Sequence, residues 1–394
     1  MKKTITVLGN FSGRNAGDAA ILGTLMRDVT ALYPGVQFKV PTINTKFVRR
    51  AYPGYDVQPV GLMPWNLSVK IFGWPTFRAV RSADVVLVTD AIMFDRRLYN
   101  PLFNYLWTLS LVLPMARRKG IPVVLYNVSL GPIFTEAGAE CLRKVIRSAD
   151  VVALRDRESF AVLEQIELSP ENVVTAADCA IGTDPAPTER VDEIATKEGL
   201  FRSGRPTVGF NINSYLDTYV RDKRERGVQR QKFVRDFAAT VDRAIEEFEA
   251  DVVVVETQPM DLGIANELLA AIRHRDRVKM ISNRTYYYDE LAGLMSRMEL
   301  FVGMRTHSLI LAASVRTPVV GIVTYPKNRG FMRSIGLEDY LIEFKDFSAE
   351  AFFGLVERGW RNRTSVRKHL ENVVPRERAK ARATAELLRP FLTA

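Results

Sequence analysis

Three side chains suited to binding an anion or moving a proton follow two apolar segments late in the chain. Residues 300–304 are apolar and lead directly into Arg305 and His307. The next apolar run, residues 318–323, is followed by Lys327. If both runs are strands of an open α/β sheet, these side chains emerge at the edge where such sheets bind ligands. The types and spacing predict an anion held by Arg305 and Lys327, with His307 as the proton-transfer group.

A run of small and apolar residues begins at Thr306 and predicts a helix. The first amides of a helix favour an anion, so Thr306 and Ser308 join the candidate binding residues. The alternative is a surface arginine and lysine beside a histidine that caps the helix. The placement of all three side chains after strands favours the binding interpretation.

The segment from Arg305 to Lys327 resembles the C-terminal signature of the polysaccharide pyruvyl transferases. Three other segments are similar to further elements of that family, in the family's order. They are residues 9–23 with Gly17-Asp18, residues 154–159 with Arg-Asp-x-x-Ser, and residues 178–180. The resemblance implies an α/β fold of two Rossmann-like domains facing a cleft, similar to the glycosyltransferase-B architecture. It also implies transfer of the enolpyruvyl group of phosphoenolpyruvate, a co-substrate and not a cofactor, onto a sugar as a pyruvate ketal.

The N-terminal loop places Gly9, Gly13 and Gly17 four residues apart. This spacing matches neither the dinucleotide fingerprint nor the P-loop, so it does not support nicotinamide or ATP binding. The resemblance makes the loop, with Asn15 and Gly17, a wall of the expected cleft. Asp18 follows, either as the cap of a helix running to Leu32 or as a proton acceptor.

The chain departs from the family pattern after the apolar run 85–88. The family usually has glycines there, whereas this chain has Asp90-Ala91-Ile92, followed by an acidic residue at the family's position, Asp95. Asp95 could act as general base on the acceptor hydroxyl. The alternative is an ion pair with Arg96 or Arg97.

A second departure lies in the run 208–215. Many family members have an arginine here that contacts the donor, but this chain has Asn211 and Asn213. These amides can hydrogen-bond a ligand without replacing the charge, which leaves phosphoenolpyruvate open as the donor. At the end of the run 252–255, Glu256 and Gln258 are expected to face the ligand edge, and Asp261 to cap the next helix.

Nine apolar, β-branched runs alternate with helix-length segments, the pattern of parallel sheets. The runs begin at residues 5, 85, 123, 151, 208, 252, 278, 300 and 319. Turn residues between 184 and 206 predict a boundary between an N-terminal domain, 1–190, and a C-terminal domain, 200–394. The C-terminal domain would carry the Arg-x-His motif. Residues 362–391 predict a long basic helix that returns to the first domain.

The composition excludes some classes of binding partner and favours others. The net charge is +10, with two cysteines and three histidines, so neither a disulfide framework nor a structural metal site is predicted. No RNA motif or zinc finger accompanies the basic segments, which argues against nucleic acid. A lipid-linked saccharide acceptor would explain both the charge and the Trp-rich segment 61–77, through peripheral membrane contact. Residues 102–115 predict a buried helix. The short apolar N-terminus predicts a cytoplasmic protein, with this acceptor at the inner face of the membrane; the oligomeric state is not predicted.

Two other functions remain open. A glycosyltransferase of the same two-domain class would use a nucleotide sugar, with Glu338 or Asp339 placed for a ribose. A catalytically inactive family member is suggested by the missing glycines and arginine.

Overall fold

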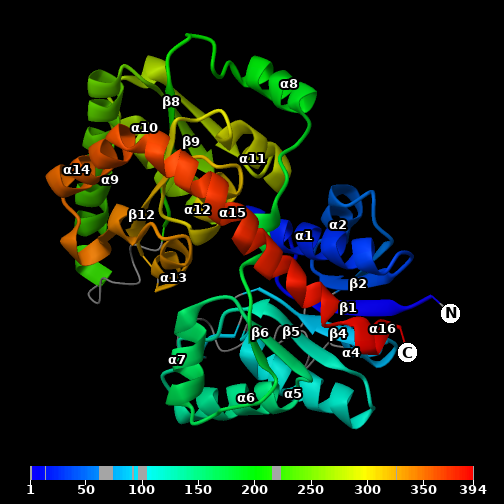
Figure 1. Ribbon diagram of the computed structural model, residues 1–394. Helices are drawn as coiled ribbons and strands as arrows, with labels where there is room; N and C mark the ends of the chain where they lie inside the picture. Colours follow the sequence, from blue (N-terminus) through cyan, green and yellow to red (C-terminus); the bar gives the residue numbers. More distant parts are fainter. Residues whose placement is uncertain are drawn as a thin grey trace. The chain divides into compact units, whose positions relative to one another are not determined.

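The computed structural model describes residues 2–13, 15–61, 74–90, 93–95, 104–214, 223–324 and 326–393, with the side chains of 223–228 and 326 excepted. The chain forms two compact units (Figure 1). The first contains Met1–Gly13, Asp18–Gly182 and Glu377–Ala394, and the second contains Arg14–Gly17 and Thr183–Arg376. The boundary after Gly182 lies earlier than the predicted linker. The C-terminal segment Glu377–Ala394 belongs to the first unit.

A seven-stranded sheet, with all described pairs parallel, forms the first unit in the order β3-β2-β1-β4-β5-β6-β7. The strands are β1 (Thr4–Leu8), β2 (Gln37–Thr42), β3 (Val57–Gly61), β4 (Val85–Val88), β5 (Val123–Val128), β6 (Val151–Leu154) and β7 (Val173–Thr175). The helices are α1 (Ala16–Leu32), α2 (Thr45–Ala51), α4 (Trp74–Arg81), α5 (Tyr105–Arg118), α6 (Glu136–Arg147) and α7 (Arg157–Gln165). The strand order reverses between β1 and β4, which is where this class of sheet binds ligands.

The second unit has a six-stranded parallel sheet in the order β10-β9-β8-β11-β12-β13. Its strands are β8 (Thr207–Asn211), β9 (Asp251–Glu256), β10 (Val278–Ser282), β11 (Leu300–Gly303), β12 (Val319–Val323) and β13 (Leu341–Glu343). Its helices are α8 (Thr188–Glu198), α9 (Lys223–Phe248), α10 (Leu262–Ala271), α11 (Tyr288–Met295), α12 (Thr306–Ser314), α13 (Pro326–Ser334) and α14 (Ala349–Arg361). Here the order reverses between β8 and β11.

The last helices, α15 (Arg363–Glu386) and α16 (Arg389–Leu392), complete the chain. Each sheet carries its own buried core, because helices cover the apolar faces of nearly every strand. The core of the second unit includes an aromatic cluster, in which Phe233, Phe237, Phe347 and Phe352 pack ring against ring. These cores hold the ends of the strands in place, and the candidate residues follow those ends.

The two α/β sheets confirm the predicted fold class, and each of the nine predicted runs is a strand. Four strands were not predicted: β2 and β3 contain proline and polar residues, and β7 and β13 have three residues each. The predicted buried helix is α5. The Trp-rich segment lies mostly outside the described residues, but Trp74 begins α4 and is 69% exposed.

Candidate functional site

His307 lies in the first turn of α12, at the switch point of the second sheet, and packs against the backbone of Gly17. A Cβ atom built on Gly17 would come within 2.0 Å of the imidazole Cγ and 2.2 Å of Nδ1. Since real side chains do not approach so closely, glycine is required at position 17 for the ring to occupy this place. The adjacent Ala16 amide donates to the Thr257 carbonyl just beyond β9, at 3.0 Å. Residues 15–17 therefore dock at the ligand edge of the second sheet.

Asn15 caps the helix that begins at this point. Its Oδ1 accepts a hydrogen bond from the Gly17 amide at 2.8 Å, and α1 then runs to Leu32 as predicted. The capping role considered for Asp18 is thus performed by Asn15, three residues earlier. Asn15 and Gly17 position the start of α1 beside His307.

Arg305 is engaged by a carboxylate of its own unit. Its Nε and one terminal nitrogen each lie 2.7 Å from an oxygen of Asp261. The Arg305 side chain is 12% exposed and that of Asp261 is fully buried. This pairing corrects two expectations: Asp261 does not cap α10 with its side chain, and the charge of Arg305 is compensated within the protein. Asp261 also accepts from the amide and hydroxyl of Ser214, both at 2.9 Å.

Asn211 connects three elements of the second sheet. Its Nδ2 donates to the Val255 carbonyl at 2.9 Å, while its Oδ1 accepts from the Arg305 amide at 3.0 Å and the Ser308 hydroxyl at 3.1 Å. The side chain is fully buried. The Ser308 amide donates back to Arg305, so the backbone and side chain of Ser308 are both used internally. These bonds fix the turn from β11 into α12, and the role of Asn211 and Ser308 in substrate binding stays a prediction.

Asn213 and Thr306 are held in a second set of bonds around the end of β12. Asn213 lies near the Met304 carbonyl and the Thr324 hydroxyl, at 3.4 and 3.3 Å. Thr306 donates to Asn328, which in turn donates to Met304 at 2.8 Å. Asn213 is buried, and both side chains therefore act as positioning groups for the loop after β11.

Lys327 lies in the first turn of α13 and is half-buried, at the same edge of the sheet as α12. Glu256 ends β9 and is buried, and burial raises the pKa of its carboxyl. The Ser282 hydroxyl donates to one Glu256 oxygen, whereas the other has no hydrogen-bond partner among the described residues. Gln258 is half-buried two residues further along. The predicted edge placement of Glu256 and Lys327 agrees with the sheet order.

Asp18 lies at the corresponding edge of the first sheet, hydrogen-bonded to a second carboxyl, Asp90. Both side chains are buried, and Asn10 donates to Asp18 at 2.9 Å. Burial raises the pKa of Asp18 well above its ordinary value, and the charge of Asp90 raises it further. A hydrogen bond between two carboxyls requires a proton on one of them. Asp90 has φ of +76°, a conformation that favours glycine, at a position where the resemblance predicts glycine.

Asp95, predicted as a general base, accepts hydrogen bonds that hold the start of α6. It is fully buried, and its Oδ2 accepts from the Phe134 amide, the Thr135 amide and the Thr135 hydroxyl at 2.9, 2.7 and 2.8 Å. These three donors satisfy the buried oxygen and tie Asp95 to the start of a helix. The considered partners Arg96 and Arg97 lie outside the described residues.

The central segments that carry the resemblance form a buried network not predicted in detail. Arg155 contacts Asp178 at 2.7 Å and donates to Ser129 at 2.8 Å. Asp156 caps α7 by accepting from the Ser159 amide at 2.9 Å. The sequence carried a signal for this network, since Arg155, Asp156, Ser159 and Asp178 all lie in the resembling segments. Their arrangement favours a supporting role beneath the edge of the first sheet.

Two further features were sought among the described residues: groups of metal-binding side chains and helices able to cross a membrane. Within the described ranges, no three histidine, cysteine or acidic side chains are grouped closely enough to hold a metal ion. None of the described helices has the length and hydrophobicity that crossing a membrane requires.

Comparison with solved structures identifies proteins that have a similar fold. A putative UDP-N-acetylglucosamine 2-epimerase from Listeria monocytogenes matches with a TM-score of 0.65 and 10% identity, covering 100% of this chain and 98% of that one. Anabaena Alr3699/HepE, solved with UDP and glucose, matches with a TM-score of 0.63 and 13% identity, covering 99% of both chains. At these identities the likeness concerns the fold, which is of the glycosyltransferase-B type.

Comparison with sequences concerns the family. Amylovoran biosynthesis protein AmsJ of Erwinia amylovora is 24% identical over 339 residues, which are 82% of this chain and 77% of that protein. The family model described as polysaccharide pyruvyl transferase matches residues 15–325, from the cap of α1 to the end of β12 and beyond. This range includes Gly17, His307 and both switch points. The chain therefore belongs to the polysaccharide pyruvyl transferase family of transferases.

Proposed function

We propose that this protein transfers the enolpyruvyl group of phosphoenolpyruvate to a saccharide of an exopolysaccharide or its lipid-linked precursor, and that the product is a pyruvate ketal. The family match over residues 15–325 supports this function. So does the similarity to a protein whose name assigns it to amylovoran biosynthesis. The observation that carries the chemical part is the packing of His307 against Gly17 at the ligand edge of the second sheet.

The reaction adds two acceptor hydroxyls to one enolpyruvyl group. The first hydroxyl oxygen bonds to C2 of the enolpyruvyl group while a proton is delivered to C3, so that the methylene becomes a methyl group. The second hydroxyl oxygen then bonds to C2 as the C2–O bond to phosphate breaks. One hydroxyl proton replaces the proton given to C3 and the other leaves with phosphate. The chemistry needs one group that gives a proton, one that accepts a proton, and a fixed positive field for the leaving phosphate.

His307 is proposed as the proton donor to C3. Lys327 and the first amides of α12 are the proposed contacts of the donor's phosphate and carboxylate. Arg305 is assigned a positioning role, because Asp261 already compensates its charge.

Asp18 is proposed as the proton acceptor. It is the next residue of α1 after Gly17, whose backbone contacts His307. The raised pKa of Asp18 makes its carboxylate a stronger base than an ordinary aspartate.

The first test measures phosphate released from phosphoenolpyruvate with a panel of soluble and lipid-linked saccharides. His307→Gln should lower turnover by roughly 10²–10⁴-fold, because glutamine cannot exchange a proton at neutral pH. Gly17→Ala should lower turnover by about 10²-fold, because the new methyl group displaces the ring. Gly263→Ala is the matched control: it lies in α10, has nothing within 4 Å of an added Cβ, and should leave turnover unchanged.

The donor is tested separately by thermal shift. Phosphoenolpyruvate should raise the melting temperature of the wild type, whereas UDP- and GDP-sugars should not. Stabilisation by a nucleotide sugar alone would contradict the proposed donor and favour a glycosyltransferase. Near-normal turnover in His307→Gln would leave the imidazole as a packing group.

A further inference from the structure

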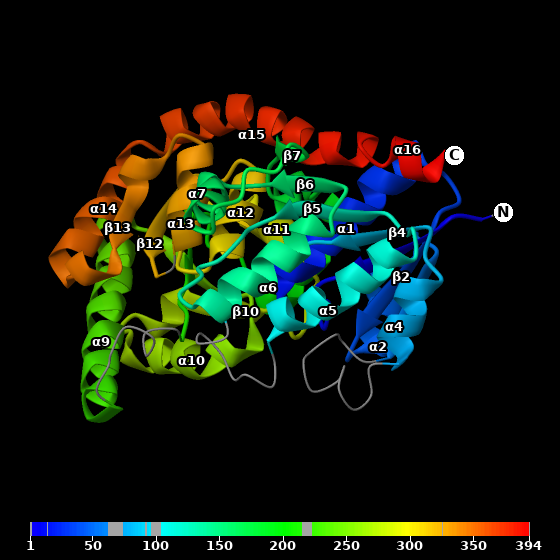
Figure 2. The same cartoon turned by 90° about the horizontal axis from the view of Figure 1, so that it is seen from below.

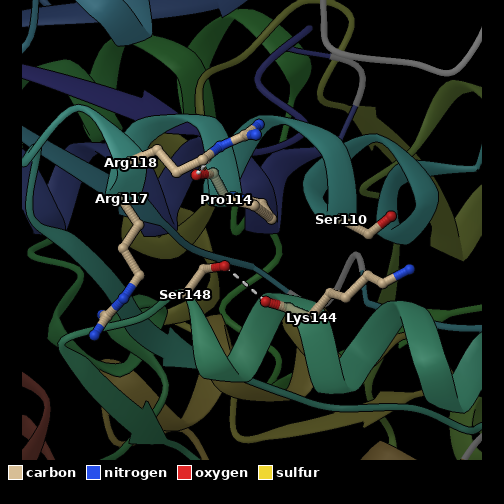
Figure 3. A pocket seen from close by; sticks show the side chains of 6 residues that line it. All are labelled: Ser110, Pro114, Arg117, Arg118, Lys144 and Ser148. Atoms are coloured by element: carbon tan, nitrogen blue, oxygen red, sulfur yellow. Dashed lines mark hydrogen bonds between the residues drawn. The ribbon is translucent and has the colours of Figure 1, made fainter.

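A basic surface with a partly exposed apolar stripe lies on α5 and α6 of the first unit, and none of the proposed chemistry uses it. The ends of these two helices border a hollow of about 570 Å³ lined by Ser110, Pro114, Arg117, Arg118, Lys144 and Ser148 (Figure 3). The two helices lie side by side against the first sheet (Figure 2). The lining contains three cations and no carboxylate.

We propose that this face of α5 and α6 docks on an anionic lipid bilayer. The basic patch is defined as five exposed cations in and beyond the last turns of the two helices: Arg117, Arg118, Lys119, Lys144 and Arg147. Arg117 has a weak ion pair with Asp150 at 3.5 Å, and Lys144 has one with Glu140 at 3.6 Å. Within the described residues, the other three cations form no ion pair. The patch therefore keeps a net positive charge.

The directions of the side chains favour a broad anionic surface over one small anion. In Figure 3, Arg117 points away from Arg118 and Lys144, and the nitrogens of the three side chains lie apart. A site for a single phosphate would need these groups to converge on one point. Arg118 Nε also donates to the Pro114 carbonyl at 3.3 Å, which holds its stem along the helix. Charges spread in this way can each meet a different lipid headgroup, and each contributes to binding.

The apolar part of the face distinguishes a bilayer from a purely ionic partner. Leu111 is 43% exposed, and Trp107 and Pro114 are half-buried. Together with Arg118 they lie three or four residues apart, so they form one stripe along α5. Such a stripe gives nothing to the phosphates of a nucleic acid but can enter the headgroup region of a bilayer. It runs along α5 from the basic patch toward Asn104 at the start of the helix.

The experiment is co-sedimentation of the full chain with vesicles, without any substrate. Vesicles of phosphatidylcholine alone are compared with vesicles that also contain phosphatidylglycerol. The wild type should bind the anionic vesicles only, and more weakly as salt rises. The triple variant Arg118→Gln, Lys119→Gln, Arg147→Gln should lose roughly five-fold in affinity per charge, on the order of 100-fold in total. Leu111→Ser should weaken binding further without changing its salt dependence.

The matched control removes the same charge from α2 of the same unit. Lys46, Arg49 and Arg50 are all exposed, and their triple glutamine variant should lose no more than about five-fold. Equal losses in the two triple variants would reduce the effect to net charge and overturn the proposal. So would wild-type binding by the patch variant, or no binding by the wild type. Turnover of a soluble saccharide should stay the same in every variant, so that failure of this proposal is distinguishable from failure of the proposed transfer.

Discussion

At the residue scale, the hydrogen-bond partner of Arg305 changes the role that we infer for it. An arginine after a strand, two residues before a histidine, is typical of anion recognition. The fully buried carboxylate of Asp261 holds two of its nitrogens at 2.7 Å. The pair fixes the loop after β11 to the start of α10, and this places His307.

The Arg305–Asp261 pair predicts a loss of stability when only one partner is removed. Arg305→Ala should lower the free energy of unfolding by about 3–5 kcal/mol, because it leaves a buried carboxylate without its counter-charge. The double variant Arg305→Ala, Asp261→Asn should recover part of that loss. Urea unfolding measures both. A fully stable Arg305→Ala protein with greatly weakened donor binding would contradict the positioning role and restore Arg305 as a donor contact.

Asp18 predicts a pH dependence of stability whose sign follows from its raised pKa. Near the ordinary pKa of 3.8 and below, the carboxyl tends to be protonated in the folded and the unfolded chain. As the pH rises, the unfolded chain ionises first, so stability falls until the folded pKa is passed. The slope can reach about 1.4 kcal/mol per pH unit for one group.

The measurement is the free energy of unfolding of the wild type and Asp18→Asn between about pH 4 and pH 8. Asp18→Asn should lose this component of the slope and gain stability relative to the wild type as the pH rises. Asp276→Asn, at an exposed position, is the control and should follow the wild type. Parallel curves for the wild type and Asp18→Asn would show that Asp18 titrates normally.

At the scale of elements, the junction before α6 is assembled from residues that are distant in the sequence. Asp95 follows β4 and binds the amides that precede α6, while Thr135 caps the helix by accepting from Gly138 at 3.0 Å. Gly138 is required there, because an added Cβ would lie 2.4 Å from Asp95 Oδ2. The carboxylate thus joins the edge of the first sheet to the helix.

This junction predicts that Asp95 affects stability and not the chemical step. Asp95→Asn should lower the free energy of unfolding by about 1–3 kcal/mol. The substitution weakens or removes the buried oxygen that accepts hydrogen bonds from three donors. Turnover per folded molecule should stay within about two-fold of the wild type, since Asp95 is bound by three donors and buried. Chemical unfolding and active-site-normalised turnover test the two statements. A large loss of turnover in a stable variant would return Asp95 to the role of general base.

At the scale of the whole molecule, the chain ends in the unit where it began. Asn127, at φ of +53°, donates to the Ala381 carbonyl at 2.9 Å and accepts from the Thr384 hydroxyl at 2.5 Å. Both partners belong to the part of α15 that packs in the first unit. The last segment is therefore part of the first unit's core, through residues such as Leu388 and Leu392.

This anchor predicts that Asn127→Ala destabilises the first unit by about 2–3 kcal/mol, because buried groups of α15 lose their partners. Asn127→Gly should be less harmful than alanine, since glycine adopts a positive φ without strain. Asn172→Ala, which removes one hydrogen bond to Ala149, is the comparison for a single lost bond. Unfolding followed by urea, with hydrogen exchange on α15, measures these effects. Unchanged protection of α15 in Asn127→Ala would contradict the anchor.

Features that depend on local pattern could be predicted from the sequence. Runs such as Val85–Val88 and Val319–Val323 are strands because β-branched residues repeat where two helical layers bury them. The order of strand and helix makes the sheets parallel, and the sheet order then brings residues after the strands to one edge. The place of His307 and Lys327 followed from that pattern alone.

Which side chains form contacts across long stretches of the chain depends on the tertiary structure. Arg305 meets Asp261 from 44 residues away, and Asp95 meets Thr135 from 40 residues away. The requirement for glycine at position 17 comes from the packing of His307, which is far from it in the sequence. The sequence does not show whether a charged side chain binds a ligand or forms a buried ion pair within the protein. Only packing, which sets the distance between partners and removes them from water, separates the two.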